Sequence, residues 1–157
     1  MTRLTLATVL QLTMLAPLAE GAETESYADA YRKTAETGQP LVVLVGAEWC
    51  PACVDMKRTV VPRLRQQGLL QRVAFALVDI DRDRELGQKL IAGGAIPQLI
   101  VCRKAPDGWH RQRLIGGQSV KTVEELLHRE IVACQADRKP EEQAKTPNPT
   151  HPSPEKG

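Results

Sequence analysis

The chain has almost no excess of charge of one sign. Its 21 Lys and Arg residues are balanced by 19 Asp and Glu residues, which leaves a formal net charge of +2 at pH 7. Proteins that bind nucleic acid through its phosphates gather Lys and Arg into a patch or stripe, and no such stripe stands out in the sequence. The composition therefore argues against a nucleic-acid partner, and it implies neither an acidic nor a basic one.

The sequence also lacks an apolar run long enough to span a bilayer. The stretch Leu4–Leu18 is interrupted by polar residues and falls short of the roughly 20 residues that a spanning helix needs. It follows the single positive charge of Arg3 and precedes small residues, which is the layout of a secretory signal peptide. We expect cleavage after Gly21, so that residues 1–21 are removed and no stable membrane insertion remains.

The cleavage site of this segment and its removal have alternatives. Ala19 or Ala22 are alternative last residues of the signal, and a buried N-terminal helix or an uncleaved anchor is the alternative to removal. No cysteine lies near this segment, which argues against a lipid anchor on an N-terminal cysteine.

Export would decide the chemistry of the cysteines. Outside the cytosol, in the periplasm or beyond, thiols are not held reduced. All four cysteines are then candidates for disulfide chemistry.

Large apolar residues are missing from the other end of the chain. Residues 137–157 contain five prolines and only small or polar residues besides. Such a segment cannot bury enough surface to offset the entropy lost on ordering, so we expect a disordered, proline-rich tail. Residues 22–136 remain as one domain, without an internal repeat.

Helical and strand patterns alternate within this domain. Apolar runs of strand length predict strands buried on both faces, and helical spacing between stop residues predicts helices. Pro62 is expected to end or kink the second helix. The order α-β-α-β-α-β-β-α predicts an α/β fold with a central four-stranded mixed sheet flanked by helices on both faces. The expected helices are 26–36, 51–61, 81–91 and 119–132, and the expected strands are 41–45, 73–80, 96–102 and 109–115.

Two of the only four cysteines lie where a strand gives way to a helix, in "VVLVGAEWCPACVDMKR". Cys50 is expected at the helix N-terminus, where unpaired N–H groups and the helix dipole stabilise a thiolate and lower a thiol pKa from about 8.5 into the range of roughly 3.5–7.5. Cys53 lies one turn deeper, within reach of Cys50. This predicts an exposed nucleophile, Cys50, and a buried resolving thiol, Cys53.

The neighbours of the cysteine pair suit this arrangement. Pro51 fits the first helical turn, because its missing N–H would have had no partner there. Trp49 would offer a flat apolar surface beside the nucleophile. Packing of Trp49 into the core is the alternative, although its position next to a strand end favours partial exposure.

The motif "AEWCPAC" after "VVLV", with "AIP" before an apolar strand and "GG" before the last helix, resembles the thioredoxin fold. The resemblance covers about residues 26–132 and implies an exported thiol–disulfide oxidoreductase without a cofactor. Cysteine-containing protein substrates and a redox partner protein would be its partners. It implies a cis peptide bond at Pro97, with the backbone of Ile96 open to strand-like pairing with a substrate, and a backbone at Gly116 that passes close to the active-site surface. A trans proline and a plain turn glycine are the alternatives.

The sequence departs from thioredoxins at two places. The buried Asp and Lys that move the proton of the resolving cysteine in that family are replaced by Leu44 and Leu77. Proton transfer from Cys53 is then expected to use water or Glu48. Pro51-Ala52 matches neither the Gly-Pro of thioredoxins nor the Pro-His of strongly oxidising periplasmic enzymes. The direction of electron flow therefore stays open between reductase, oxidase and isomerase.

The other two cysteines leave further alternatives. Cys102 and Cys134 would form a second disulfide only if their Cα atoms lay within about 4.4–6.8 Å. A buried Cys102 in the third strand and an unpaired Cys134 at the end of the last helix are favoured. A zinc site of all four cysteines would need them to converge. A copper site would need His110 or His128, which we expect on the surface.

A non-enzymatic role is the main competing hypothesis. The domain would then be an exported thioredoxin-like binding module, in which the disulfide between Cys50 and Cys53 is only structural. Trp49 and Ile96 would form its adhesive patch.

Overall fold

The computed structural model describes residues 26–145 of the chain. The expected signal peptide, residues 1–21, lies outside the described residues, as does the end of the expected tail. Within residues 26–145, no helix has both the length and the apolar character needed to cross a membrane.

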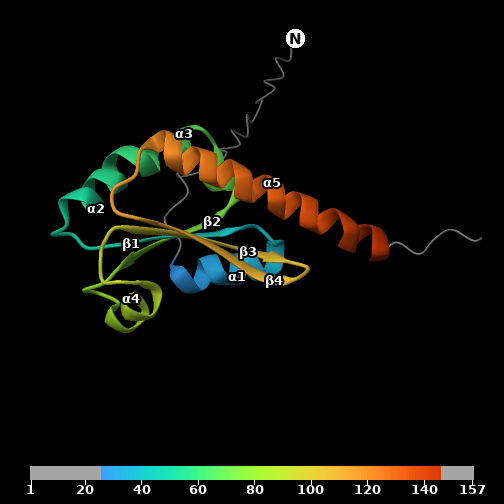
Figure 1. Cartoon of the computed structure of the whole chain (residues 1–157), viewed down its shortest axis with the longest axis horizontal. Helices are drawn as coiled ribbons and strands as arrows, with labels where there is room; N and C mark the ends of the chain where they lie inside the picture. The colour runs from blue at the N-terminus through green and yellow to red at the C-terminus, as the bar shows by residue number, and fades with distance from the viewer. Residues whose placement is uncertain (1–25, 146–157) are drawn as a thin grey trace, which may run out of the picture.

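Four strands form one mixed sheet in the order β2-β1-β3-β4. β2 runs parallel to β1, whereas β3 is antiparallel to β1 and β4 is antiparallel to β3. Figure 1 shows α1 and α4 on one face of the sheet and α2, α3 and α5 on the other. This arrangement confirms the expected fold class. The strands are Leu41–Gly46 (β1), Ala74–Asp79 (β2), Gln98–Ala105 (β3) and Gly108–Ile115 (β4).

The helices lie close to their expected positions, apart from the ends of two of them. An N-cap serine, Ser26, accepts a hydrogen bond from Asp29 N–H, and Gly38 ends the first helix in the left-handed conformation. The helical segments are Tyr27–Thr37 (α1), Pro51–Asp55 (α2), Met56–Val60 (η1, a π-helix), Val61–Gln66 (α3), Leu69–Arg72 (η2, a 3₁₀-helix), Arg84–Leu90 (α4) and Val120–Lys145 (α5).

Pro62 does not end the second helix. α2, η1 and α3 follow one another without a break from Pro51 to Gln66, and the segment just before the proline is π-helical. The N–H of Val61 bonds to the carbonyl of Met56, five residues back. A wider turn of this kind gives Pro62, which has no N–H and a bulky ring, a place inside a continuous helix.

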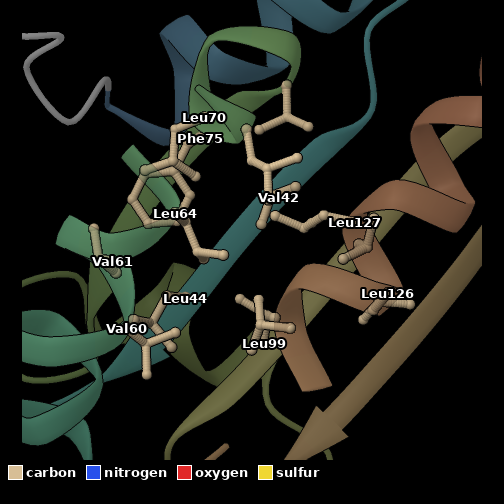
Figure 2. Close-up of a cluster of buried hydrophobic side chains, with 14 of the residues drawn as sticks. Val42, Leu44, Val60, Val61, Leu64, Leu70, Phe75, Leu99, Leu126 and Leu127 are labelled. Atoms are coloured by element: carbon tan, nitrogen blue, oxygen red, sulfur yellow. The ribbon is translucent and has the colours of Figure 1, made fainter. Parts of the chain in front are cut away.

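The core is divided by the sheet, because β1 is buried on both faces. Val42 and Leu44 point towards the α2, α3 and α5 side, where they pack with Leu99 and Leu127 (Figure 2). The alternate residues of β1 pack towards α1 and α4 on the other face. An uninterrupted apolar run is what a strand covered on both faces requires, so β1 was readable from the sequence.

The last helix was expected to end near Val132, but α5 continues to Lys145. Beyond Val132, contacts with the end of α1 hold α5 as far as Arg138. The Cys134 thiol donates to the carbonyl of Gly38 at 2.8 Å, and the Arg138 guanidinium donates to the last carbonyl of α1 at 2.7 Å. Polar side chains in this stretch satisfy buried or terminal groups of α1, which the composition of the segment does not indicate.

Candidate active site

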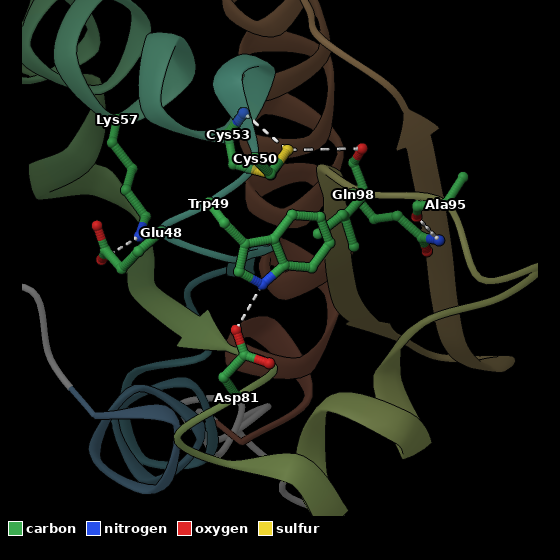
Figure 3. The surroundings of a disulfide bond; sticks show 9 residues. Glu48, Trp49, Cys50, Cys53, Lys57, Asp81, Ala95 and Gln98 are labelled. Atoms are coloured by element: carbon green, nitrogen blue, oxygen red, sulfur yellow. Dashed lines mark hydrogen bonds and ion pairs between the residues drawn. A yellow bond between two sulfur atoms is a disulfide. The ribbon is translucent and has the colours of Figure 1, made fainter.

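Cys50 caps the N-terminus of α2, and Pro51 is the first residue of that helix (Figure 3). Cys50 has an extended backbone, and its sulfur accepts a hydrogen bond from the N–H of Cys53 at 3.2 Å. The two sulfurs form a disulfide, with 5.2 Å between the Cα atoms. The fold therefore places the sulfur of Cys50 against the unpaired N–H groups of a helix start, where a negative charge on sulfur is stabilised.

The burial of the two cysteines differs less than expected. Cys53 is 1% exposed, and Cys50 is 6% exposed rather than openly accessible. Ile80 and Ile96 pack against the pair and cover it. The expectation of an exposed nucleophile is therefore wrong for the disulfide form, although Cys50 is still the outer of the two residues.

Gly46, the last residue of β1, lies directly under Cys53. A Cβ built on Gly46 would lie 2.9 Å from both the Cβ and the sulfur of Cys53. That separation is shorter than a van der Waals contact, so the end of β1 can approach α2 this closely only without a side chain.

We expect Gly46→Ala to destabilise the oxidised protein by about 1–3 kcal/mol, because the added methyl must displace a buried, cross-linked side chain. Chemical denaturation of the disulfide form measures this loss. Gly117→Ala is the matched control, because its methyl would lie at an ordinary 3.6 Å from the Cβ of Ala52. Equal stability of both variants and the wild type would contradict the close approach at Gly46.

Trp49 lies on the surface beside the cysteine pair and not in the core. Its side chain is 66% exposed, and its indole N–H donates to Asp81 at 2.7 Å. Trp49 follows β1 and Asp81 follows β2, and these neighbouring strands are parallel. Their carboxyl ends therefore meet at one edge of the sheet. From the sequence, Asp81 was expected only as the first residue of a helix. Its position directly after a strand parallel to β1 was the signal that could have predicted its contact with Trp49.

The charged residues nearest the motif do not reach the sulfurs. Glu48 forms an ion pair with Lys57 at 3.0 Å (Figure 3), and its side chain is largely exposed. Leu44 lies directly opposite Leu77 in the β1–β2 register, so neither of these two positions holds a charge. Among residues 26–145, no carboxylate hydrogen-bonds to the sulfur of Cys53.

The segment before β3 faces Cys50. The Ile96–Pro97 peptide bond is cis, the isomer that the resemblance implies. The carbonyl oxygen of Ile96 lies 3.9 Å from the sulfur of Cys50, and in the described part of the chain the Ile96 N–H donates to no other backbone group. Gly116 donates its N–H to the carbonyl of Pro97 at 2.8 Å, which ties the end of β4 to this segment.

Gly116 has a backbone conformation that favours glycine. A Cβ on Gly116 would meet nothing within 4 Å, so the glycine is not needed to avoid a clash within the protein itself. Its φ is +85°, a conformation that side-chain-bearing residues rarely adopt. The residue that approaches the motif is Gly117, at ordinary contact distance from Ala52.

Cys102 and Cys134 are both free, so the second disulfide is not formed. Cys102 is half-buried on the α1 side of the sheet, whereas Cys134 is buried within α5 and not at its end. Over residues 26–145, no group of three or more His, Cys, Asp or Glu residues could hold a metal ion. His110 contacts Asp107 instead.

Burial raises the pKa of Cys102, and the nearby guanidinium of Arg111 lowers it by less. We therefore expect the reduced protein to be alkylated at Cys102 only slowly near neutral pH, with the rate rising at a pH above that of an ordinary thiol. Site-resolved mass spectrometry after iodoacetamide treatment measures this rate. Alkylation of Cys102 as fast as that of Cys50 at pH 7 would contradict it.

Comparison with known proteins agrees with this geometry. A family model described as thioredoxin-like matches residues 22–103, more than half of the chain. A search of curated proteins gave no match. A thioredoxin from Thermus thermophilus has a similar structure, with a TM-score of 0.60 and 22% identity, covering 74% of this chain and 92% of that one. Chloroplastic thioredoxin z has a TM-score of 0.59 and 20% identity, covering 74% and 98%. The chain belongs to the thioredoxin-like family.

Proposed function

We propose that the protein is a thiol–disulfide oxidoreductase that exchanges disulfides with cysteine-containing proteins. The observation that carries the proposal is the position of Cys50. Its sulfur caps a helix N-terminus, bonds to Cys53, and lies 3.9 Å from the backbone carbonyl of Ile96. A buried structural disulfide does not need a helix start to stabilise a thiolate, whereas a redox pair does.

The reaction follows from the two sulfurs. In the reduced protein, the Cys50 thiolate attacks one sulfur of a substrate disulfide, so that a mixed disulfide forms and the substrate's other sulfur leaves as a thiolate, which takes up a proton. The Cys53 thiolate then attacks the Cys50 sulfur and releases the second substrate thiol. Two electrons pass to the substrate, and the Cys50–Cys53 disulfide remains. The reverse sequence oxidises a dithiol.

The surface around Cys50 suits a protein substrate. Trp49 offers an exposed aromatic face, held by Asp81, on one side of the motif. On the other side, the free N–H of Ile96 and the turn at Pro97 and Gly116 offer backbone to an extended substrate segment. Pairing of this kind supplies affinity through main-chain hydrogen bonds that depend little on sequence. Pro51, which follows Cys50, is also exposed.

Proton release from Cys53 is proposed to go to water. The family's buried charges are replaced by Leu44 and Leu77, and Glu48 is engaged by Lys57. Transfer to water requires no fixed carboxylate, but it requires the packing around the buried cysteine pair to open and admit water.

Export is part of the proposal and rests on residues 1–21. Expression of the full chain in a Gram-negative host followed by fractionation tests it. We expect a periplasmic protein whose first residue is Ala22 or a near neighbour. An intact Met1 on protein recovered from the cytosol would contradict export and would leave the redox proposal standing.

Insulin reduction with dithiothreitol as the electron donor tests the redox proposal. We expect the protein to accelerate insulin precipitation well beyond the rate with dithiothreitol alone. The competing binding-module hypothesis, which the low exposure of Cys50 favours, predicts no acceleration. A rate equal to that of dithiothreitol alone would therefore overturn the proposed activity.

A further inference from the structure

The segment between α4 and β3 has little of its own to fix its shape. Residues 92–95 are exposed, and the segment contains no helix or strand. Gly93 and Gly94 both have a φ of +72°, and a Cβ on either would meet nothing within 4 Å. Consecutive glycines without packing contacts allow many backbone conformations. Something outside the segment must therefore hold it where it is.

Gln98, the first residue of β3, provides this hold. It is 0% exposed, and its amide reaches back to the preceding segment. The amide nitrogen donates to the carbonyls of Ala92 at 2.7 Å and Ala95 at 2.6 Å, and the amide oxygen accepts from the N–H of Ala92 at 3.1 Å. Figure 3 shows Gln98 and Ala95 on the side of the site that faces Cys50.

Arg113 of β4 completes the arrangement. Its guanidinium donates both to the amide oxygen of Gln98 and, at 2.7 Å, to the carbonyl of Leu90 at the end of α4. A glutamine amide has two donor hydrogens and two acceptor sites on its oxygen. All four are used, and three of them bind the segment. A buried polar group that is satisfied in this way is rigid, and it is costly to disrupt.

The held segment ends at Ile96, the residue that approaches the redox sulfur. Its carbonyl lies 3.9 Å from the Cys50 sulfur, and its side chain packs against the cysteine pair. A shift of the backbone at Ala95 would therefore move both groups relative to Cys50. The amide of Gln98 fixes the Ala95 carbonyl, which belongs to the same peptide group as the Ile96 N–H.

We propose that Gln98, supported by Arg113, is a positioning residue that holds the 92–96 backbone in register for pairing with a protein substrate. The inference rests on the proposed function and adds a residue to it. Gln98 does not touch the reacting sulfurs. Its loss should therefore weaken reaction with a substrate that needs the backbone of Ile96, and should spare reaction with a small disulfide that does not.

The experiment compares two substrates, insulin and 5,5′-dithiobis(2-nitrobenzoate), in the wild type and in Gln98→Met. Methionine has a similar length but cannot form the four hydrogen bonds. We expect kcat/KM for insulin to fall about tenfold to a hundredfold, as for a small misplacement of a binding group. The rate with the small disulfide should stay within about threefold. Equal losses with both substrates, or no loss with either, would overturn the proposal.

Two further variants separate positioning from folding. Gln98→Glu keeps an acceptor for the Ala92 N–H, but a carboxylate oxygen replaces the donor nitrogen and would face the carbonyl oxygens of Ala92 and Ala95. It should therefore shift the substrate ratio in the same direction as Gln98→Met. Glu130→Gln is the control, because it weakens another buried contact of β3, the 3.1 Å ion pair with Arg103, at the far end of the strand. This control should leave the substrate ratio unchanged. If Glu130→Gln shifted the substrate ratio as much as Gln98→Met does, the proposal would be contradicted.

Amide hydrogen exchange supplies a readout that does not depend on activity. In Gln98→Met, the Ala92 amide should exchange at least about tenfold faster, because its acceptor is gone, while amides of β1 keep their protection. Unchanged protection of Ala92 would overturn the positioning role. A wild type that reduces neither disulfide would instead contradict the proposed function, which is a distinguishable result.

Discussion

Replacing Cys50 with serine should reduce catalysed turnover of a protein disulfide to the background rate, a loss of about three orders of magnitude or more. The reason is that the hydroxyl at this position has no comparable thiolate form, so the helix start has no nucleophile to stabilise. Insulin reduction measures the loss. Cys102→Ser, which removes a half-buried thiol on the α1 side of the sheet, should keep nearly full activity.

Cys53→Ser should behave differently from Cys50→Ser, because it leaves the nucleophile and removes the resolving thiol. We expect it to accumulate mixed disulfides through Cys50 that are visible on non-reducing gels and absent after reduction. Cys50→Ser should trap none. If Cys53→Ser also trapped none, or if both variants kept wild-type turnover, the assigned roles would be wrong.

The second large effect is expected from Leu44→Asp, which restores a carboxyl at the position where thioredoxins have a buried one. Leu44 is 2% exposed and lies among apolar residues, directly opposite Leu77. An unpaired charge buried there should lower the free energy of unfolding by about 3–5 kcal/mol at neutral pH. Urea denaturation of the reduced protein measures the change.

The effect has a defined pH dependence. Burial disfavours the charged carboxylate, so the folded-state pKa of the new Asp lies above its unfolded value. The loss of unfolding free energy relative to the wild type is therefore complete above the folded-state pKa, and it shrinks as the pH falls through that pKa. Adding Leu77→Lys should recover part of the loss at neutral pH by pairing the charge. A loss of unfolding free energy that grows on acidification would contradict this account of the core. So would a double variant that is destabilised by more than the sum of the losses of the two single variants.

Much of the fold was predictable because it rests on local patterns. The continuous apolar run at Leu41–Val45 indicated a strand covered on both faces, and β1 is buried along its whole length. The cysteine motif at the strand–helix junction fixed the place of the candidate site. These features depend on neighbouring residues or on a simple alternation, which a sequence displays directly.

The remaining features depend on contacts between distant residues. The length of α5 is supported by Cys134 and Arg138 contacting the end of α1, about a hundred residues earlier in the chain. Ile80 and Ile96 pack against the cluster that contains Cys50 and Cys53, and only the folded sheet brings them there. Gln98 looks like a misplaced polar residue in a strand until its four hydrogen bonds are seen.

The site itself was found only in part. Cys50, Cys53 and Trp49 lie together as the motif indicates, and Ile96 faces them. The expected role of Gly116 beside the active-site surface stays a prediction; its N–H bonds to the Pro97 carbonyl, and its positive φ favours glycine. A sequence does not say whether a glycine is needed because its φ is positive or because a side chain would not fit.

The pH dependence of Cys50 alkylation in the reduced protein tests the assignment of this residue as the reactive nucleophile. The account requires that the first turn of α2 keeps the sulfur ionised and that the packing of Ile80 and Ile96 opens on reduction. The rate of Cys50 modification by iodoacetamide should then be half-maximal at a pH clearly below about 8.5, the value for a free thiol. A midpoint at or above that value, or a sulfur that does not react in the folded protein at any pH, would contradict the account.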